Sequence, residues 1–403
     1  MDVVLARCAV LDGHQKTVVA WGWIRTETET LETIQTFSTT TEDLRRLSAW
    51  LATQGVTHVA MESTGRDWKP VFNLLEEDFT TGLVNPAHIQ AVPGRKTDVK
   101  DSAWIAQWLQ PSFIPDRAQR ELRERIRYRK SLIEERAREA NRIQQGLEGA
   151  HIQLGSVISD VLGISGTRIL HALARGETDP AQLAALADDR LRATADDLTR
   201  ALDGLMASHQ QFLLTAQLQH LTALDQQIAT LDAEVERRLA PLAETQALIE
   251  SHPGIGKRTA ETVLSEIGAT VAPFRTPEAL AKWVGLAPGN HESAGKRLSG
   301  RTIPGNRSLR AALVEAGQAA GRTKATYVGA QYRRMARTKG AKRAAVIVAH
   351  TLVVDLWYML HRHQPYVDLG VEYFDQRDRE RVQRQAVKRL EALGYQVTLK
   401  PAS

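Results

Sequence analysis

The chain has little cysteine and no long uninterrupted apolar run. Cys8 is the one cysteine among 403 residues, so no disulfide can form within the chain, and a reducing compartment suits it. The N-terminus begins Met1-Asp2 without a basic segment before an apolar one, so we expect no signal peptide. The longest apolar stretch, residues 344–360, is broken by His350 and Asp355. We therefore expect a core helix of a cytoplasmic protein and no membrane span.

Positive charge is unevenly distributed along the chain. The formal net charge is +5, yet residues 251–403 hold 25 Lys and Arg against 12 Asp and Glu, so the preceding part is net negative. Most of the positive excess lies between residues 251 and 350. A basic region beside an acidic one suggests a polyanionic partner held near a metal centre.

Four carboxylates in the first quarter of the chain are the most informative residues. Asp12 and Glu62 each close an apolar run, while Asp98 and Asp101 stand three apart at the start of a predicted helix. Two acids at strand ends and two on one helical face can converge on a divalent cation such as Mg²⁺, which prefers oxygen ligands and assists phosphoryl transfer. The alternative for the helical pair is a cap with a first-turn acid, and Asp12 could simply end a strand in a turn.

Strand and helix signals alternate over residues 3–110. We predict strands at residues 3–10, 17–23, 34–37, 56–61 and 81–84, and helices at 41–51, 68–75 and 97–109. This order suggests a mixed α/β sheet of the ribonuclease H type, to which Asp12 and Glu62 would contribute from strand ends.

Residues 115–250 have an almost entirely helical pattern. Leucines recur every three or four residues between Leu214 and Val235, which suits a long antiparallel helix pair or an intermolecular coiled coil. Between the two long helices, residues near Gly163 and Asp179 indicate a short helical subdomain. The first long helix is rich in arginine between residues 117 and 129. Interleaved glutamates favour a solvated face there, with nucleic-acid contact as the alternative.

The composition changes at residue 251. Pro253-Gly254-Ile255-Gly256 followed by Lys257 and Arg258 has the helix-hairpin-helix form. Its glycines let the backbone approach a phosphate, and the amides at the next helix start attract an anion. The alternative is a tight turn between two helices without a ligand; the adjacent cations favour phosphate contact.

A second basic segment contains serines flanked by glycine. Ser293 precedes Lys296 and Arg297, and Arg301 and Arg310 follow. These cations could neutralise phosphate charge in a transition state, and a serine hydroxyl can act as a covalent nucleophile when activated. Considered alone, such a loop is more often a plain nucleic-acid contact.

Taken together, these motifs resemble the DEDD-type transposases of bacterial insertion sequences, the RNA-guided group called bridge recombinases. The N-terminal resemblance rests on Leu11-Asp12-Gly13-His14, Met61-Glu62-Ser63-Thr64-Gly65 and residues 96–103; the C-terminal one rests on Pro253-Gly254-Ile255-Gly256, Glu292-Ser293, Gly305-Asn306 and Leu309-Arg310. The resemblance implies a RuvC-like catalytic domain (1–112), a helical coiled-coil linker and oligomerisation region (113–248), and a basic, mostly helical C-terminal domain (249–403). One departure is Gly13, where the family usually has a small aliphatic residue.

The resemblance also implies an enzyme that exchanges DNA strands. Asp12, Glu62, Asp98 and Asp101 would bind Mg²⁺ or Mn²⁺, and Ser293 would form a phosphoserine link to DNA, with Ser299 as its main rival. The implied partners are donor and target DNA, a structured non-coding guide RNA and further copies of the chain, as a dimer or tetramer, with no membrane. The residues expected to contact nucleic acid are Gly254, Gly256, Lys257, Arg258, Lys296, Arg297, Arg301, Asn306 and Arg310.

Two other functions fit part of the pattern. A metal-dependent nuclease, such as a Holliday-junction resolvase, needs the carboxylates but no serine. A non-catalytic nucleic-acid-binding protein needs the basic region but no converging carboxylates. A covalent adduct between protein and DNA excludes the first, and metal-dependent strand cleavage excludes the second.

Overall fold

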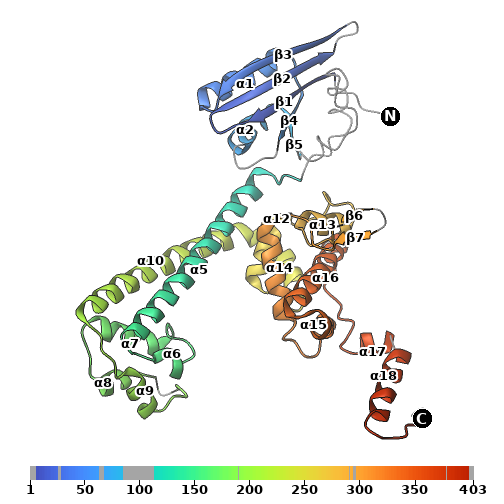
Figure 1. Cartoon of the computed structure of the whole chain (residues 1–403). Helices are drawn as coiled ribbons and strands as arrows, with labels where there is room; N and C mark the ends of the chain where they lie inside the picture. Colours follow the sequence, from blue (N-terminus) through green and yellow to red (C-terminus); the bar gives the residue numbers. More distant parts are fainter. Residues whose placement is uncertain are drawn as a thin grey trace. The chain divides into compact units, whose positions relative to one another are not determined.

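The computed structural model of the chain describes residues 6–25, 29–62, 68–84, 113–188, 190–289, 291–293, 296–377 and 379–398. The chain divides into two compact units, Met1–Arg117 and Ala118–Ser403. Figure 1 shows strands in the first unit and mostly helices in the second, which is the α/β plus α layout that the sequence predicts. The helix predicted at residues 97–109 lies outside the described residues.

A five-stranded mixed sheet forms the described part of the first unit. Its strands are β1 (Arg7–Gly13), β2 (Thr17–Arg25), β3 (Thr30–Ser38), β4 (His58–Glu62) and β5 (Thr80–Val84). Their order in space is β3-β2-β1-β4-β5. β2 runs antiparallel to β1 and β3, whereas β1, β4 and β5 are parallel to one another.

One face of this sheet carries the core of the first unit. Ala9 and Leu11 of β1 are 1 % exposed, while Val10 between them is only half-buried, as expected for a strand with alternating faces. The helices α1 (Thr41–Thr53) and α2 (Trp68–Leu75) pack their apolar residues against the Ala9–Leu11 face. Thr40 begins α1 by accepting a hydrogen bond from the Asp43 amide at 3.4 Å.

Two long helices dominate the start of the second unit. α5 (Arg117–Gly149) and α10 (Ser208–Leu239) run antiparallel, since α5 residues 121 and 136 pair with α10 residues 238 and 225 respectively. This pair lies within one chain, which is the first of the two arrangements that the leucine spacing allows. At its far end, a separate core includes Ile143, Leu170 and Leu218. The short helices of that subdomain are α6 (Leu154–Val157), α7 (Ile164–Ala174), α8 (Pro180–Ala184) and α9 (Ala195–Leu202).

The C-terminal part of the second unit is helical around a small hairpin. Its elements are η1 (Ala240–Leu242), α11 (Ala243–Glu250), α12 (Lys257–Ile267), α13 (Pro277–Val284), β6 (His291–Ser293), β7 (Lys296–Ser299), α14 (Arg307–Ala320), α15 (Tyr327–Lys339), α16 (Ala341–Arg362), α17 (Tyr373–Arg377) and α18 (Arg379–Glu391).

α16 is the core helix of this part, as the sequence predicts. Ten of its residues are buried, among them Val348, Leu352 and Leu356, and it packs against α13, α14 and α15. Among the described residues, α16 is the one helix long and apolar enough to cross a membrane by length and composition. Because more than half of its apolar window is buried inside the protein, these properties are those of a core helix.

Candidate active site

Two of the four predicted carboxylate positions lie on neighbouring strands. β1 and β4 are parallel, and their register pairs Leu11 with Met61. The next residue on each strand is Asp12 and Glu62 respectively. Both positions therefore lie side by side at the carboxyl ends of two adjacent parallel strands.

The surroundings of Asp12 are polar and open. Its side chain is 38 % exposed, and one carboxylate oxygen lies 3.6 Å from Nε2 of His14. The His14 amide donates to the Thr17 carbonyl at 2.8 Å, which fixes the β1–β2 turn beside the carboxylate. Asp12 is thus held at the end of a rigid strand while its oxygens stay accessible to a cation.

The other predicted metal ligands are only partly covered by the structure. Asp98 and Asp101 lie outside the described residues, and for Glu62 only the backbone is described. Within the described ranges, no three His, Cys, Asp or Glu side chains gather closely enough to hold a metal ion. The structure therefore brings together the backbone positions of two of the four predicted ligands.

The predicted nucleophile lies on the β6–β7 hairpin. Ser293 is the last residue of β6 and pairs with Lys296, the first residue of β7. Ser299 ends β7 and pairs with His291, so it lies at the opposite end of the hairpin. A register irregularity between His291 and Glu292 separates the two ends. The two candidate serines therefore occupy different positions, with Ser293 beside the turn.

The base of the hairpin is closed by backbone contacts. Pro288 and Thr302 form an isolated antiparallel bridge, and the Gly289 amide donates to the Arg301 carbonyl at 2.9 Å. Arg310 of α14 donates to the Thr302 hydroxyl at 2.8 Å. Arg301 and Arg310, two of the residues predicted to contact nucleic acid, therefore both lie at the short segment that follows β7.

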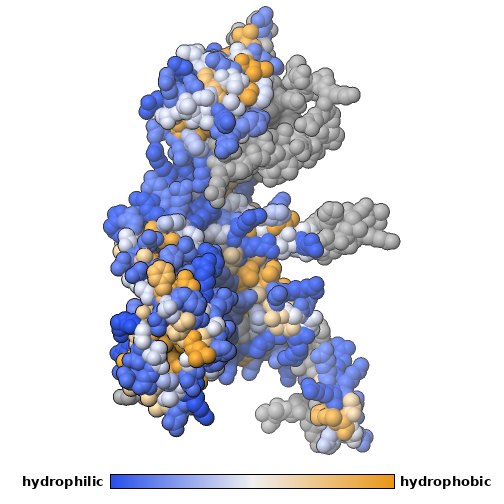
Figure 2. Space-filling model, turned by 60° about the vertical axis from the view of Figure 1, so that its left-hand side comes forward, coloured by the Kyte–Doolittle hydropathy of each residue, from blue (hydrophilic) through white to orange (hydrophobic). Residues whose placement is uncertain are grey.

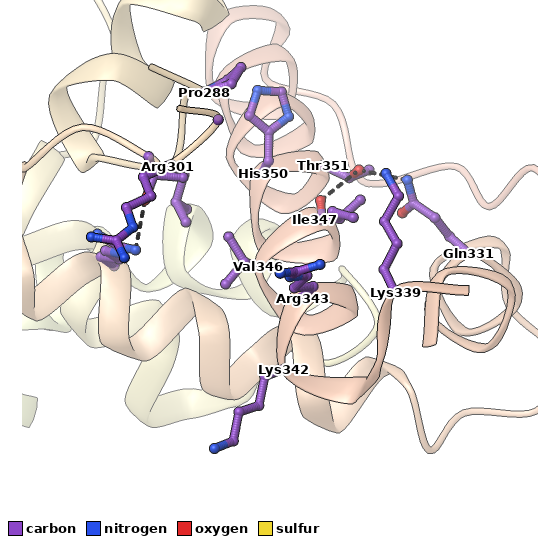
Figure 3. Close-up of a pocket in the computed structure, with 14 residues that line it drawn as sticks. Pro288, Arg301, Gln331, Lys339, Lys342, Arg343, Val346, Ile347, His350 and Thr351 are labelled. Atoms are coloured by element: carbon purple, nitrogen blue, oxygen red, sulfur yellow. Dashed lines mark hydrogen bonds between the residues drawn. The ribbon is translucent and has the colours of Figure 1, made fainter. Parts of the chain in front are cut away.

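A cavity of about 1170 Å³ opens beside this segment. Its walls come from the segment after β7 and from α14, α15 and α16 (Figure 3). Arg301 and Arg310 are among its lining residues, together with Lys339, Arg343 and His350.

The helix-hairpin-helix segment joins α11 to α12. Gly254 has φ of +91°, and a Cβ there would meet the Ala316 carbonyl at 2.7 Å, so glycine is required for packing. Gly256 precedes the first residue of α12, and its surroundings are open. Lys257 pairs with Glu236 at 3.3 Å, and Arg258 binds Asp232 through both of its terminal nitrogens.

Asn306 has two hydrogen bonds within the protein. Its side-chain oxygen accepts from the Leu309 amide at 3.1 Å and so begins α14, and its nitrogen donates to Glu266 at 2.6 Å. This residue therefore joins α14 to α12, whichever further contact it makes.

Comparisons with known proteins find transposase families in both the N-terminal and the C-terminal part of the chain. A family model described as a transposase, of the DEDD type, matches residues 11–152, and a model described as the transposase IS116/IS110/IS902 family matches residues 246–333. The chain is also 26 % identical to a probable family 20 transposase of Pseudomonas aeruginosa over 318 residues, which cover 76 % of this chain and 85 % of the relative.

The chain is an IS110-type transposase. Enzymes of this kind cut and join DNA, so DNA is the substrate class. The first matched region of the transposase includes all four predicted carboxylates, and the second includes Ser293 and Ser299.

An ionic network in the transposase was missed by sequence reasoning. Arg123 and Arg127 of α5 bind Glu266 at 2.9 and 2.8 Å, and Glu266 is fully buried. Arg129, 3 % exposed, binds Glu261, 2 % exposed, at 2.5 Å. Burial lowers the pKa of Arg123, and the Glu266 carboxylate opposes that shift. These arginines fix α5 to α12 and do not form the solvated face that the interleaved glutamates favour.

A buried histidine was missed as well. His252 lies directly before the Pro253-Gly254 turn, and its Nε2 lies 3.1 Å from an Asp355 carboxylate oxygen of α16. Its ring packs on Tyr366 with 4.0 Å between centroids, and burial raises the pKa of that phenol. The turn is thereby tied to the core helix. The available sequence signal was a histidine beside a predicted turn, together with an aspartate inside the apolar run of α16.

Proposed function

We propose that the transposase exchanges DNA strands with a metal-bound carboxylate tetrad and a phosphoserine intermediate. The tetrad is Asp12, Glu62, Asp98 and Asp101, in a RuvC-like domain of residues 1–112. The observation that carries the proposal is the placement of Asp12 and Glu62 at the carboxyl ends of the adjacent parallel strands β1 and β4. The strand order, with an antiparallel β2, supports the ribonuclease H-type assignment.

The donor set fits a hard divalent cation. Carboxylate oxygens are the ligands that Mg²⁺ and Mn²⁺ prefer, and the Asp12 side chain is exposed enough to reach one. When bound, such an ion supplies charge neutralisation at the scissile phosphate. Asp12 and Glu62 contribute by presenting two negative charges from rigid strand ends.

Ser293 acts as the nucleophile in this proposal. Its hydroxyl loses a proton, its Oγ bonds to the scissile phosphorus, and the bond from phosphorus to the departing strand breaks, releasing a terminal hydroxyl. A DNA hydroxyl then attacks the phosphoserine, forms the new phosphodiester and returns the serine. Each step exchanges one phosphate ester for another, so no external energy source is needed. The register supports this role, because Lys296 stands opposite Ser293 and Arg297 stands opposite Glu292.

Nucleic-acid contacts extend to the helix-hairpin-helix segment. The side chains of Lys257 and Arg258 are 55 % and 51 % exposed despite their ion pairs, so each keeps donors accessible to a phosphate. The proposal also assigns phosphate contact to Gly254 and Gly256, and to Lys296, Arg297, Arg301, Asn306 and Arg310. A structured guide RNA encoded by the element pairs with donor and target DNA, which leaves the protein to read backbone and shape, as in another RNA-guided system.

The transposase acts as a homo-oligomer, a dimer or tetramer, in this proposal. Figure 2 shows hydrophobic side chains at the surface in several places, including the lower left. Exposed large apolar residues around the helical subdomain and the start of α10 include Ile164, Leu205 and Phe212, which are 67 %, 77 % and 74 % exposed. Exposed apolar residues of this size mark protein interfaces when they form a patch. Because these side chains are exposed in the single chain, they can pack against another copy.

A reconstituted recombination reaction tests the proposal. Purified protein, donor DNA, target DNA and the element's structured RNA are combined with Mg²⁺, and recombinant junctions are counted by sequencing. Asp12→Asn, Glu62→Gln, Asp101→Asn and Ser293→Ala should each lower junction formation at least 100-fold, whereas Ser299→Ala should retain part of it. Metal-dependent cleavage without junctions would favour the metal-dependent nuclease, and junctions independent of RNA would overturn RNA guidance.

A further inference from the structure

The cavity beside the β-hairpin is strongly basic. Its charged lining residues are Arg301, Arg310, Lys339, Lys342 and Arg343, and neither Asp nor Glu is among the residues that line it. His350 adds a further nitrogen donor at one end. Figure 3 shows Arg301, Lys339, Arg343 and His350 placed around the cavity on different parts of the chain, whereas Lys342 points away from it. A cavity lined by several cationic side chains and by no acidic ones favours the binding of an anion.

Two basic residues lie at the start of α16, where a helix normally favours acidic residues. Lys342 and Arg343 lie in its first turn, where the helix dipole is positive and acidic residues are normally favoured. α16 has no acidic residue in that turn, and its N-cap, Gly340, makes no side-chain cap. Over the described ranges, neither these two residues nor Lys339 has an ion-pair partner. A bound anion would offset this unfavourable concentration of positive charge.

The remaining lining residues favour a sugar-phosphate backbone over a stacked base. Leu286, Pro288, Val346 and Ile347 supply apolar surface, and no Phe, Tyr or Trp lines the cavity. Stacking of bases on single strands requires aromatic faces, whereas backbone contact requires cations and hydroxyl or amide donors. The cavity therefore fits phosphate and sugar groups.

We propose that this cavity binds the phosphodiester backbone of a DNA strand and leads that strand to the β6–β7 hairpin. The inference rests on the proposed function, because it names where the strand attacked by Ser293 is held. The cavity wall includes Pro288 and Thr302, which close the base of the hairpin. The contacts from α16 lie beyond the matched family region, which ends at residue 333. Neither the motifs nor the family resemblance pointed to Lys339, Lys342 or Arg343.

Equilibrium binding tests the cavity without chemistry. Full-length Ser293→Ala protein is titrated into a fluorescent single-stranded DNA of mixed sequence at several salt concentrations. The triple change Lys339→Gln, Lys342→Gln and Arg343→Gln should weaken binding and lower the slope of log affinity against log salt by about 2, given about 0.7 per phosphate contact. The matched control changes three exposed cations of α18: Arg384→Gln, Lys388→Gln and Arg389→Gln. It should leave the slope unchanged.

The results of this titration separate the inference from its alternatives. An equal loss in both triple variants would mean that net charge alone is sensed and would overturn the proposal. A loss for an RNA of the same sequence that exceeds the loss for DNA would replace the DNA strand with RNA and would also overturn it. The melting temperature of the cavity variant should stay close to that of the unaltered protein, because removing Lys342 and Arg343 from the first turn of α16 is favourable whereas removing Lys339 from the last turn of α15 is not. Loss of binding in the cavity variant together with absence of a serine adduct in the unaltered protein would retain the cavity and reject the proposed chemistry.

Discussion

Asp12 and Glu62 directly follow Leu11 and Met61, which face each other on the parallel strands β1 and β4. Two acids separated by 50 residues in sequence are thus brought to the ends of neighbouring strands by the sheet register alone. Leu11 and Met61 are 1 % and 3 % exposed, so both strands are anchored in the core directly before the two acids. This is the structural basis on which the carboxylate tetrad is proposed.

The tetrad should bind divalent metal as a unit. Mg²⁺ or Mn²⁺ should raise the melting temperature of the unaltered protein, because a ligand at 100 times its Kd adds about 2.7 kcal/mol of stability. A variant carrying Asp12→Asn, Glu62→Gln and Asp101→Asn should lose this rise. Without metal it should be as stable or more stable, since repulsion between carboxylates is relieved. Glu32→Gln, at an exposed position of β3, is the control. A normal metal response in the triple variant would contradict the assignment.

Sheet and helix positions were largely predictable because their apolar residues have clear periods. The strand predicted at residues 34–37 proved to be β3, which spans Thr30–Ser38. Its extra length was hidden because Leu31 and Ile34 are 51 % and 63 % exposed, so no alternation of buried residues marks its start. The pairing of β1 with β4 could be expected only from the alternation of strands and helices.

The roles of the charged residues were much harder to predict. Arg129 and Glu261 are 132 positions apart, so nothing local in the sequence shows that they pair. A run of arginines on a helix has the same pattern whether it faces water, a phosphate or buried acids. The useful signal was in α12, where Glu261 and Glu266 stand within a stretch that is buried from Ala260 to Ile267. Acids in such a stretch require partners.

Breaking the Arg129–Glu261 pair should be strongly destabilising. Arg129→Met leaves the Glu261 carboxylate buried with less compensation, at a cost of about 3–5 kcal/mol. Arg129→Met combined with Glu261→Leu should cost less than the sum of the single changes, because the isolated buried charge is removed. Chemical denaturation followed by circular dichroism measures these differences. Arg237→Ala, which removes an exposed ion pair with Glu234, should cost less than about 1 kcal/mol. Additive costs at positions 129 and 261 would show that the pair is not coupled.

Asp232 should make the second unit sensitive to acid. Hydrogen bonds from Arg258 lower the pKa of Asp232, and the charges of Arg258 and Arg129 act in the same direction. A carboxyl group with a lowered folded pKa stabilises the fold above its unfolded pKa of about 3.9, and this contribution disappears as the pH falls through the folded pKa.

Asp232→Asn should therefore be less stable than the unaltered protein at pH 7, and the difference should narrow as the pH falls below about 4. Thermal melts across pH 3–7 measure the effect. Asp196→Asn, at an exposed site in α9, serves as the control. A stability difference for Asp232→Asn that is constant across this range would contradict the role of its charge.

The identity of the residue that is joined to DNA decides whether the proposed phosphoserine intermediate forms. Reactions with Mg²⁺ are stopped by denaturation, the DNA is digested, and the modified peptide is sequenced by mass spectrometry. We expect a phosphodiester remnant on Ser293 that is absent from Ser293→Ala and from the tetrad variants and is retained in Ser299→Ala. A remnant on Ser299, or recombination that proceeds with no serine adduct, would contradict this expectation.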